Sequence, residues 1–153
     1  MFYKHVEPCI LFHMHNYQAP KELRIGHIHL KVSNLERSIS FYREVLGFNL
    51  LFNEGSFAFL SVNNYHHHIG LNTWQSHGKE PGSQRAPGLY HFALNYPTQT
   101  NLGCIVKRLI EKHWPIEGSA DHTSHLAVYT ERRMNFRLYR GGPIAKYIAQ
   151  AKP

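Results

Sequence analysis

The sequence predicts an α+β fold of paired βαβββ modules that form an open, barrel-like cleft. The same order of patterns, which is a strand, a helix and three short strands, occurs twice along the chain. The segment GHIHLKV from Gly26 also aligns with YHFALNY from Tyr90 at an offset of 64 residues, which places His27 on His91. A repeat of this length indicates a duplicated supersecondary unit.

The first module is expected over about residues 25–75. Residues 25–32 alternate well enough to form a strand. A helix over 33–47 follows, because Asn34 suits its N-cap, apolar residues recur at helical spacing and Gly47 suits its end. Three short strands joined by turn residues come next: FNLLFNEG, SFAFLSVN and YHHHIGLNTW.

The second module is expected over about residues 88–142, after a connector at 76–88 that is rich in Gly, Pro and Ser. It begins with a strand at 89–96. A helix at 100–114 follows, with its apolar residues on one face. Three further strands complete the module: PIEGSADH, HLAVYTE and MNFRLYRGG.

The length and composition suit one compact domain. A chain of 153 residues with 42% hydrophobic residues is long and apolar enough to bury a core. We expect this domain over residues 25–143, between an N-terminal tail at 1–24 and a C-terminal tail at 144–153. The formal net charge of +7 favours an anionic partner.

Several classes of partner and location are disfavoured. No basic helix stripe and no aromatic RNA-binding motif is present, so we expect no nucleic acid. No apolar run approaches the roughly 20 residues that span a bilayer, so we expect no membrane. Cys9 and Cys104 are too few and too far apart for a disulfide framework. The expected location is therefore a reducing cytoplasm.

Histidine is the residue type that carries the chemistry in this sequence. The chain has 13 histidines, and imidazole is the commonest metal ligand and the usual acid or base near neutral pH. Three of them stand together in the third strand expected after the first helix. If that strand includes them, His66, His68 and Gly70 share one face, and His67 lies on the other. The plainer interpretation is a polar strand end with exposed imidazoles.

Three segments carry a resemblance to a known family: RIGHIHLKVSNLERSISFYREVLGF, YHHHIGLNTW and GLYHFAL. They resemble the vicinal oxygen chelate superfamily, which includes glyoxalase I, bleomycin-resistance proteins and extradiol ring-cleaving dioxygenases. The second and third segments are more similar to its catechol-2,3-dioxygenase-like branch. The resemblance covers about residues 25–143. It implies a metal between the two modules, held by ligands from the first and last strands of each.

The resemblance implies that His27 and His91 are metal ligands, with Fe(II) or Mn(II) as the cofactor. The expected third ligand is a Glu near the end of the last strand. Matching IGLNTW from Ile69 with FRLYRG from Phe136 places Gly70 on Arg137, so Arg137 occupies that position. A guanidinium repels a cation and cannot deprotonate to become a ligand. His68 is the alternative third ligand, and Glu131 is a weaker one because it precedes the turn before the closing strand.

The resemblance also implies proton-transfer groups beside the metal. His66 or His67 matches the acid–base histidines of extradiol enzymes, and His68 is a further proton donor. Tyr129 resembles the tyrosine that hydrogen-bonds a catecholate, and His122 lies shortly before it. The plainer interpretation of the tyrosine is an ordinary strand aromatic. We therefore expect catalytic roles for His67, His68, His122 and Tyr129.

Two functions of different classes are compatible with these residues. The first is a metal-dependent extradiol, catechol-type ring-cleaving dioxygenase, an oxidoreductase that is impaired by Arg137. The alternative is a metal-independent protein of the bleomycin-resistance type that sequesters a small molecule. A glyoxalase-like isomerase ranks last, because it usually needs two Glu ligands. We expect a small aromatic or anionic substrate, and the resemblance also implies a homodimer.

Overall fold

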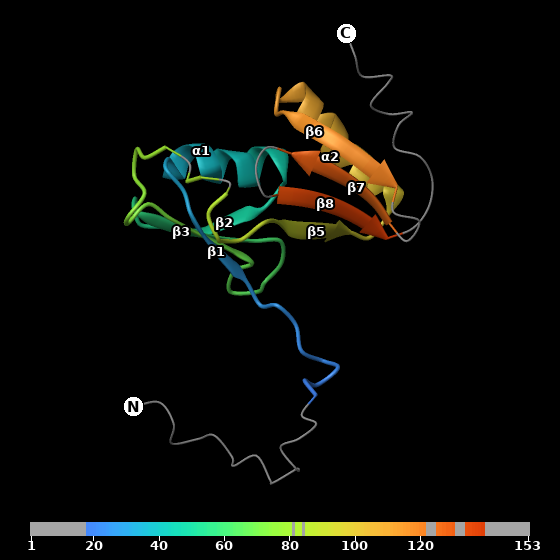
Figure 1. The fold of residues 1–153 in the computed structure, drawn as a ribbon, viewed down its shortest axis with the longest axis horizontal. Coiled ribbons are helices and arrows are strands. Elements are labelled where there is room, and N and C mark those ends of the chain that lie inside the picture. The colour runs from blue at the N-terminus through green and yellow to red at the C-terminus, as the bar shows by residue number, and fades with distance from the viewer. Residues whose placement is uncertain (1–17, 81, 84, 122–124, 131–133, 140–153) are drawn as a thin grey trace.

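In the computed structural model, the chain forms two four-stranded sheets, each accompanied by a helix (Figure 1). The structure describes residues 18–80, 82–83, 85–121, 125–130 and 134–139. The elements of the first module are β1 (Ile28–Lys31), α1 (Leu35–Ser40), the π-helix η2 (Phe41–Val45), β2 (Asn49–Asn53), β3 (Phe57–Ser61) and β4 (Ile69–Asn72). Those of the second are β5 (Phe92–Tyr96), α2 (Gln99–Glu111), β6 (Ile116–Asp121), β7 (His125–Thr130) and β8 (Met134–Tyr139).

The two sheets have the same topology. The strand order is β1-β4-β3-β2 in the first and β5-β8-β7-β6 in the second. In each sheet the first strand pairs in parallel with the last, and the remaining pairs are antiparallel. The prediction of an α+β fold with two βαβββ modules is therefore confirmed. Within the described residues, none of the helices is long and apolar enough to cross a membrane.

The first helix begins where the sequence predicts and then changes type. The Asn34 side chain accepts a hydrogen bond from the backbone N–H of Arg37 at 2.9 Å, which caps α1. The second half is a π-helix, and its last turn is closed by the N–H of Leu46 bonding to the carbonyl of Phe41. The chain then turns at Gly47, whose φ of +79° suits glycine. The prediction of one α-helix over 33–47 was wrong for this half.

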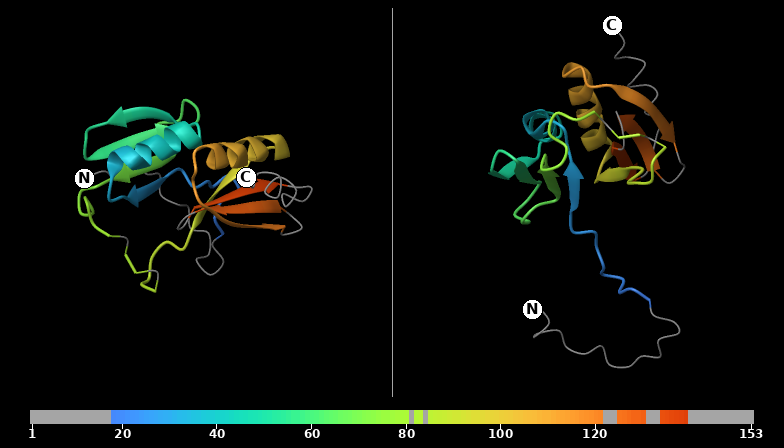
Figure 2. Two further views of the ribbon diagram at one scale, coloured as in Figure 1. Left: turned by 90° about the horizontal axis from the view of Figure 1, so that it is seen from above. Right: turned by 60° about the vertical axis from the view of Figure 1, so that its left-hand side comes forward.

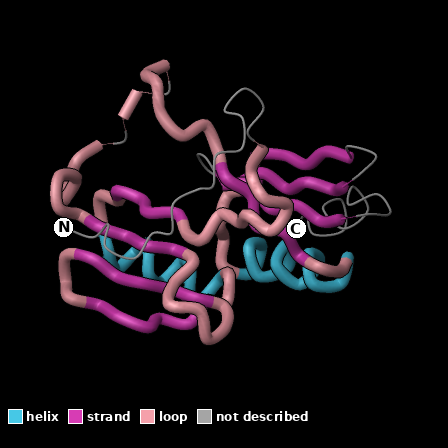
Figure 3. The backbone as a smooth tube through the Cα atoms, turned by 90° about the horizontal axis from the view of Figure 1, so that it is seen from below, coloured by secondary structure: helices cyan, strands magenta, loops and turns pink. Residues whose placement is uncertain are grey.

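The two modules share one hydrophobic core. Buried side chains from both modules form a single cluster, which includes Leu60, Leu71, Leu102, Leu109 and Leu126. Figures 2 and 3 show α1 and α2 next to each other where the modules meet. There Trp114 packs on Phe41 with ring centroids 4.3 Å apart. Arg108 of α2 donates hydrogen bonds to the carbonyls of Glu44 and Val45, so it occupies acceptors at the end of η2.

Three strands begin later than the sequence predicts, and each difference concerns histidines. β1 starts at Ile28 and β5 at Phe92, so His27 and His91 lie just before them, and β4 starts at Ile69, after the three histidines. The side chain of Asn63 accepts a hydrogen bond from the N–H of Tyr65 at 2.8 Å, which forms an Asx turn in the segment between β3 and β4. The prediction of a strand through His66 and His68 was therefore wrong.

Candidate functional site

The first sheet has one apolar face toward the core and one face lined by rings. Ile69 and Leu71 of β4 belong to the core cluster, and the intervening Gly70 faces the other way. Aromatic and imidazole rings surround this glycine, and each of them contacts at least one other ring. We call this surface the ring-lined face; its members are His27, His29, Phe52, Phe57, Phe59, His67 and Trp74.

Gly70 has a packing role at the centre of this face. It is paired with His29 of β1 on one side and with Phe59 of β3 on the other. The ring of His29 lies directly over it, because a Cβ added to Gly70 would be 2.9 Å from Cγ of His29. The absence of a side chain at this position therefore lets the imidazole lie against the sheet.

The three consecutive histidines have different surroundings. His67 is half-buried and stacks on Phe59, with ring centroids 4.2 Å apart and an interplanar angle of 12°. Its ring also lies 4.4 Å from that of His27, and its Nδ1 lies 2.6 Å from Nδ1 of His66. His68 instead forms a hydrogen bond between its Nδ1 and Oγ of the buried Ser61, at 2.9 Å. The structure thus brings His27, His66 and His67 together and holds His68 against β3.

Burial lowers the pKa of the His67 imidazole, and the neighbouring imidazoles His27 and His66 lower it further. A depressed pKa keeps this ring neutral at neutral pH, so its free nitrogen is available to accept a proton. The unfolded chain binds this proton more readily. The contribution of His67 to stability is therefore complete above its ordinary pKa of about 6.5 and declines as the pH falls below it.

We expect an NMR titration of ring protons to give His67 a midpoint below the ordinary value for histidine. Replacing His27 with Asn should raise this midpoint, because one repelling imidazolium is removed, but burial should keep it depressed. A short unfolded peptide with the sequence of residues 63–72 provides the reference. A midpoint for His67 at or above that of the peptide would contradict the assignment.

In the second module, the structure describes His91 and Tyr129 and does not describe two other predicted residues. His91 is half-buried just before β5, and its ring lies 5.3 Å from that of Tyr90. Tyr129 is half-buried in β7, paired with Gly118 of β6 and Asn135 of β8. His122 and Glu131 lie outside the described residues.

Arg137 lies in β8, whose backbone and strand pairing the structure describes. It is paired with Asn95 of β5 and with Ala127 of β7. The offset of 64 residues that aligns His27 with His91 also aligns His29 with Ala93, whose partner in β8 is Asn135. Gly70, the partner of His29, therefore corresponds to Asn135, and Asn72 corresponds to Arg137.

This register differs by two residues from the sequence alignment, which placed Gly70 on Arg137. Because strand side chains alternate with a period of two, the shift changes the position along the strand and keeps the same face. The last-strand positions that match across the two modules are thus Asn72 and Arg137. Neither of these residue types has a carboxylate to offer a metal.

Two of the three expected ligand positions hold residues that can bind a divalent metal, and the third does not. His27 and His91 hold equivalent places before β1 and β5, and imidazole suits Fe(II) or Mn(II). Within the part of the chain that the structure describes, no three His, Cys, Asp or Glu side chains are grouped so that they could hold a metal. A shared metal between His27 and His91 therefore stays a prediction.

Two further features were not predicted. Asn72 is 7% exposed, and its Oδ1 is buried with no hydrogen-bond partner among the described residues. The ring-lined face was also missed, although the alternation of Phe57 and Phe59 in the sequence could have indicated it.

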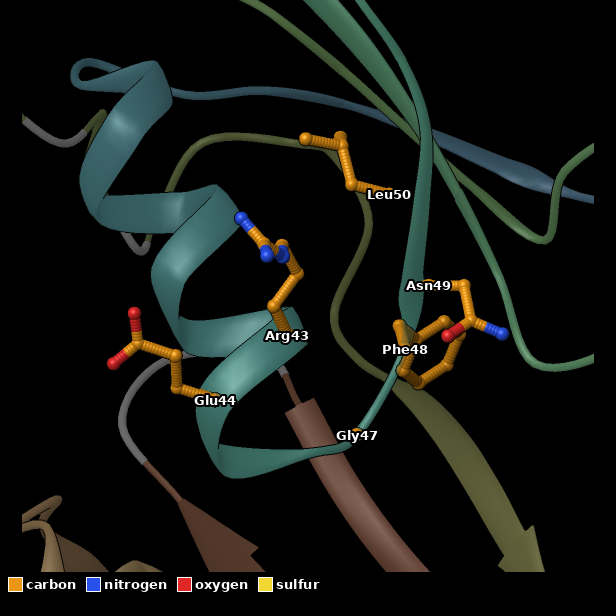
Figure 4. Close-up of a pocket in the computed structure, with 6 residues that line it drawn as sticks. All are labelled: Arg43, Glu44, Gly47, Phe48, Asn49 and Leu50. Carbon is orange, nitrogen blue, oxygen red and sulfur yellow. The ribbon is translucent and has the colours of Figure 1, made fainter.

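A pocket of about 490 Å³ lies elsewhere, at the end of η2 (Figure 4). All of its lining residues come from η2, the following turn and the start of β2: Arg43, Glu44, Gly47, Phe48, Asn49 and Leu50. The pocket contributes no residue to the predicted site.

Comparison with known proteins agrees with the fold and identifies the family. The catechol-2,3-dioxygenase of Bacillus subtilis (strain 168) is 38% identical over 100 residues, which are 64% of this chain and 35% of that protein. The chain thus spans about a third of the length of this relative.

Solved structures share the fold at low identity. A glyoxylase/bleomycin resistance protein/dioxygenase domain from Frankia sp. EAN1pec has a TM-score of 0.63 and 18% identity, and covers 79% of this chain and 95% of that one. Lactoylglutathione lyase from Agrobacterium tumefaciens has a TM-score of 0.58 and 17% identity, and covers 81% and 96%. A fosfomycin resistance protein from Listeria monocytogenes has a TM-score of 0.53 and 13% identity, and covers 82% and 98%.

The family model described as Glyoxalase/Bleomycin resistance protein/Dioxygenase superfamily matches residues 24–132, which contain both first strands and both helices. The chain therefore belongs to the glyoxalase/bleomycin resistance protein/dioxygenase superfamily.

Proposed function

We propose that the chain is a catechol-type extradiol dioxygenase whose metal-dependent step is weakened because Arg137 replaces a carboxylate. The observation that carries this proposal is the 38% identity to a catechol-2,3-dioxygenase. A second support is the ring-lined face, since flat apolar rings suit a planar aromatic compound. A metal held by His27 and His91 would supply a chelating site for the two catechol oxygens and a place for O2.

The residues of the chain supply binding and proton transfer in this proposal. Phe59 holds the ring of His67 by stacking, which fixes the direction of its nitrogen atoms. A neutral His67 accepts a proton from a catechol hydroxyl, and its position beside His27 places that base next to the predicted metal ligand. The bond between His68 and Ser61 keeps a second imidazole close by. Tyr129 takes the role that the resemblance gives it, a hydrogen bond to the catecholate.

The experiment follows the yellow ring-opened product of catechol under air, after Fe(II) is loaded at high concentration under argon. Wild-type protein should form product slowly, and His27→Ala should form less by about tenfold or more, since a first ligand is lost. His113→Asn is the matched control, because His113 is an exposed histidine beyond α2 with a φ of 55° that Asn tolerates. Equal product from wild type and His27→Ala would refute the proposed role of His27.

The second candidate is sequestration of an aromatic anion without a metal. The net charge of +7 and the Arg at position 137 favour it. Calorimetry in the presence of a chelator separates the two functions. If catechol-type compounds bind equally well with the chelator, and no product forms at any Fe(II) concentration, sequestration becomes the function.

A further inference from the structure

The segment at residues 63–68 lies between β3 and β4, and Tyr65 in it contacts the chain that enters β1. Its ring packs on those of His66 and His68, with centroids 4.3 and 5.0 Å away. Its hydroxyl lies against Gly26, because a Cβ added to Gly26 would be 2.9 Å from Oη of Tyr65. Tyr65 therefore connects the two segments that lead into the parallel strands β1 and β4.

His27 directly precedes β1 and is placed by the same segment. It is exposed, so the hydrophobic core does not restrain its ring, which lies 4.4 Å from that of His67 between centroids. The N–H of Ile28 donates a hydrogen bond to the carbonyl of His68 at 3.0 Å. The backbone is thus fixed after His27 by this bond, and before it by the contact between the preceding glycine and Tyr65.

The second module has a different residue at the equivalent place. The offset of 64 residues between the modules aligns Gly26 with Tyr90, which is 86% exposed. At position 26 even a methyl group would come too close to the hydroxyl of Tyr65, so the glycine is what leaves room for that hydroxyl. The contact therefore depends on a residue that the second module does not share.

We propose that Tyr65 is a positioning residue for His27, and that Gly26 provides the space in which its hydroxyl fits. Tyr65 acts through the backbone before β1 and through the neighbouring imidazoles, and it takes no part in proton transfer. The inference rests on the proposed function, in which His27 is a metal ligand. A ligand that is held in place before the metal binds loses less conformational freedom on binding, so the contact raises the affinity for the metal.

The test is a double-substitution cycle on Gly26 and Tyr65 in the full chain, with Fe(II) affinity measured by calorimetry under argon. Gly26→Ala adds a Cβ that meets Oη, and the tyrosine must turn aside, whereas Tyr65→Phe removes the atom that this Cβ would meet. Gly26→Ala should therefore lower the affinity by about threefold in the wild-type background and by less than about 1.5-fold in the Tyr65→Phe background. Tyr65→Ala should lower it by about tenfold.

A second readout needs no metal. The rings of His27 and His67 are close enough to give a nuclear Overhauser cross-peak between their protons in the metal-free protein. Tyr65→Ala should weaken this cross-peak, and Gly26→Ala should weaken it only when the tyrosine hydroxyl is present. Tyr90→Phe is the matched control, because it removes an exposed phenol hydroxyl next to the other predicted ligand, His91.

Thermal unfolding separates positioning from a purely structural role. Tyr65 does not belong to the core cluster, so Tyr65→Ala should change the midpoint by less than about 2 °C. A purely structural role would instead lower the midpoint in Tyr65→Ala and leave the cross-peak between His27 and His67 unchanged. That combination would overturn the inference.

The outcomes also separate this inference from the proposed function. If the cross-peak depends on Tyr65 as expected but no variant binds Fe(II), the positioning role is supported and the dioxygenase is refuted. If wild type, Tyr65→Ala and Gly26→Ala bind Fe(II) and cleave catechol equally, the positioning role alone is refuted. An effect of Gly26→Ala that is the same in both backgrounds would also refute it, and wild-type protein with neither the cross-peak nor Fe(II) binding would refute both.

Discussion

Replacing Arg137 with glutamate is expected to raise the affinity for Fe(II) by about a hundredfold or more and to speed the formation of ring-opened product. The change removes a positive charge that repels the cation and adds the carboxylate that a two-His, one-carboxylate site needs. Position 137 lies in β8, paired with Asn95 of β5, and β5 begins directly after His91. Calorimetry under argon measures the affinity, and the yellow product measures the activity.

Three variants separate the effects in this prediction. Arg137→Gln removes the charge without adding a ligand, so it should recover only a small part of the affinity. Arg137→Glu combined with His91→Ala should lose the gain, since one imidazole is missing. Asn135→Glu is the matched control, because strand pairing aligns Asn135 with Gly70, where the sequence alignment placed Arg137. A larger gain from Asn135→Glu than from Arg137→Glu would move the lost ligand position to residue 135.

Replacing Leu109 with alanine is expected to lower the free energy of unfolding by about 2–5 kcal/mol. Leu109 is completely buried in α2, within the core cluster to which both modules contribute. The loss includes the transfer of its side chain and the cavity that remains. Because the core is shared, both modules should unfold in one transition in urea, followed by circular dichroism and by tryptophan fluorescence.

Lys107→Ala is the control for this measurement. Lys107 is two residues away on the same helix, and its side chain is 77% exposed in a surface ion pair with Glu111, so its loss should cost less than about 1 kcal/mol. Two separate transitions in Leu109→Ala would show that the modules fold independently. That result would contradict the shared core as the source of stability.

The fold was predictable because each of its elements has a local signal. Short apolar segments bounded by turn residues indicated all eight strands, although several begin later than predicted. Asn34 marked the start of α1, and Gly47 marked the turn after η2. The π-helix was not predictable, because its carbonyls bond to Arg108, which lies more than 60 residues away in the sequence. Apolar spacing within the helix contains no information about such a distant donor.

The candidate site was only partly predictable from the sequence. The repeat identified His27 and His91 as equivalent positions, and their approach to one metal stays untested. The stacking of His67 on Phe59 depends on the turn at Asn63 and on the position of Phe59 in β3, the preceding strand. The alternation of residues within the histidine segment could therefore not predict this contact. The sequence alignment of the last strand was two residues away from the observed register of β8, because the segment between β7 and β8 offers no fixed reference in the sequence.

The imidazole of His29 over Gly70 restricts which substitutions this chain could acquire in evolution. Any side chain at position 70 brings its Cβ to 2.9 Å from Cγ of His29, so the imidazole ring could not stay where it is. A side chain could therefore not arise there without a shift of the His29 ring. A substitution at position 70 is therefore coupled to the side chain of residue 29 on the neighbouring strand, which would have to move or be replaced as well.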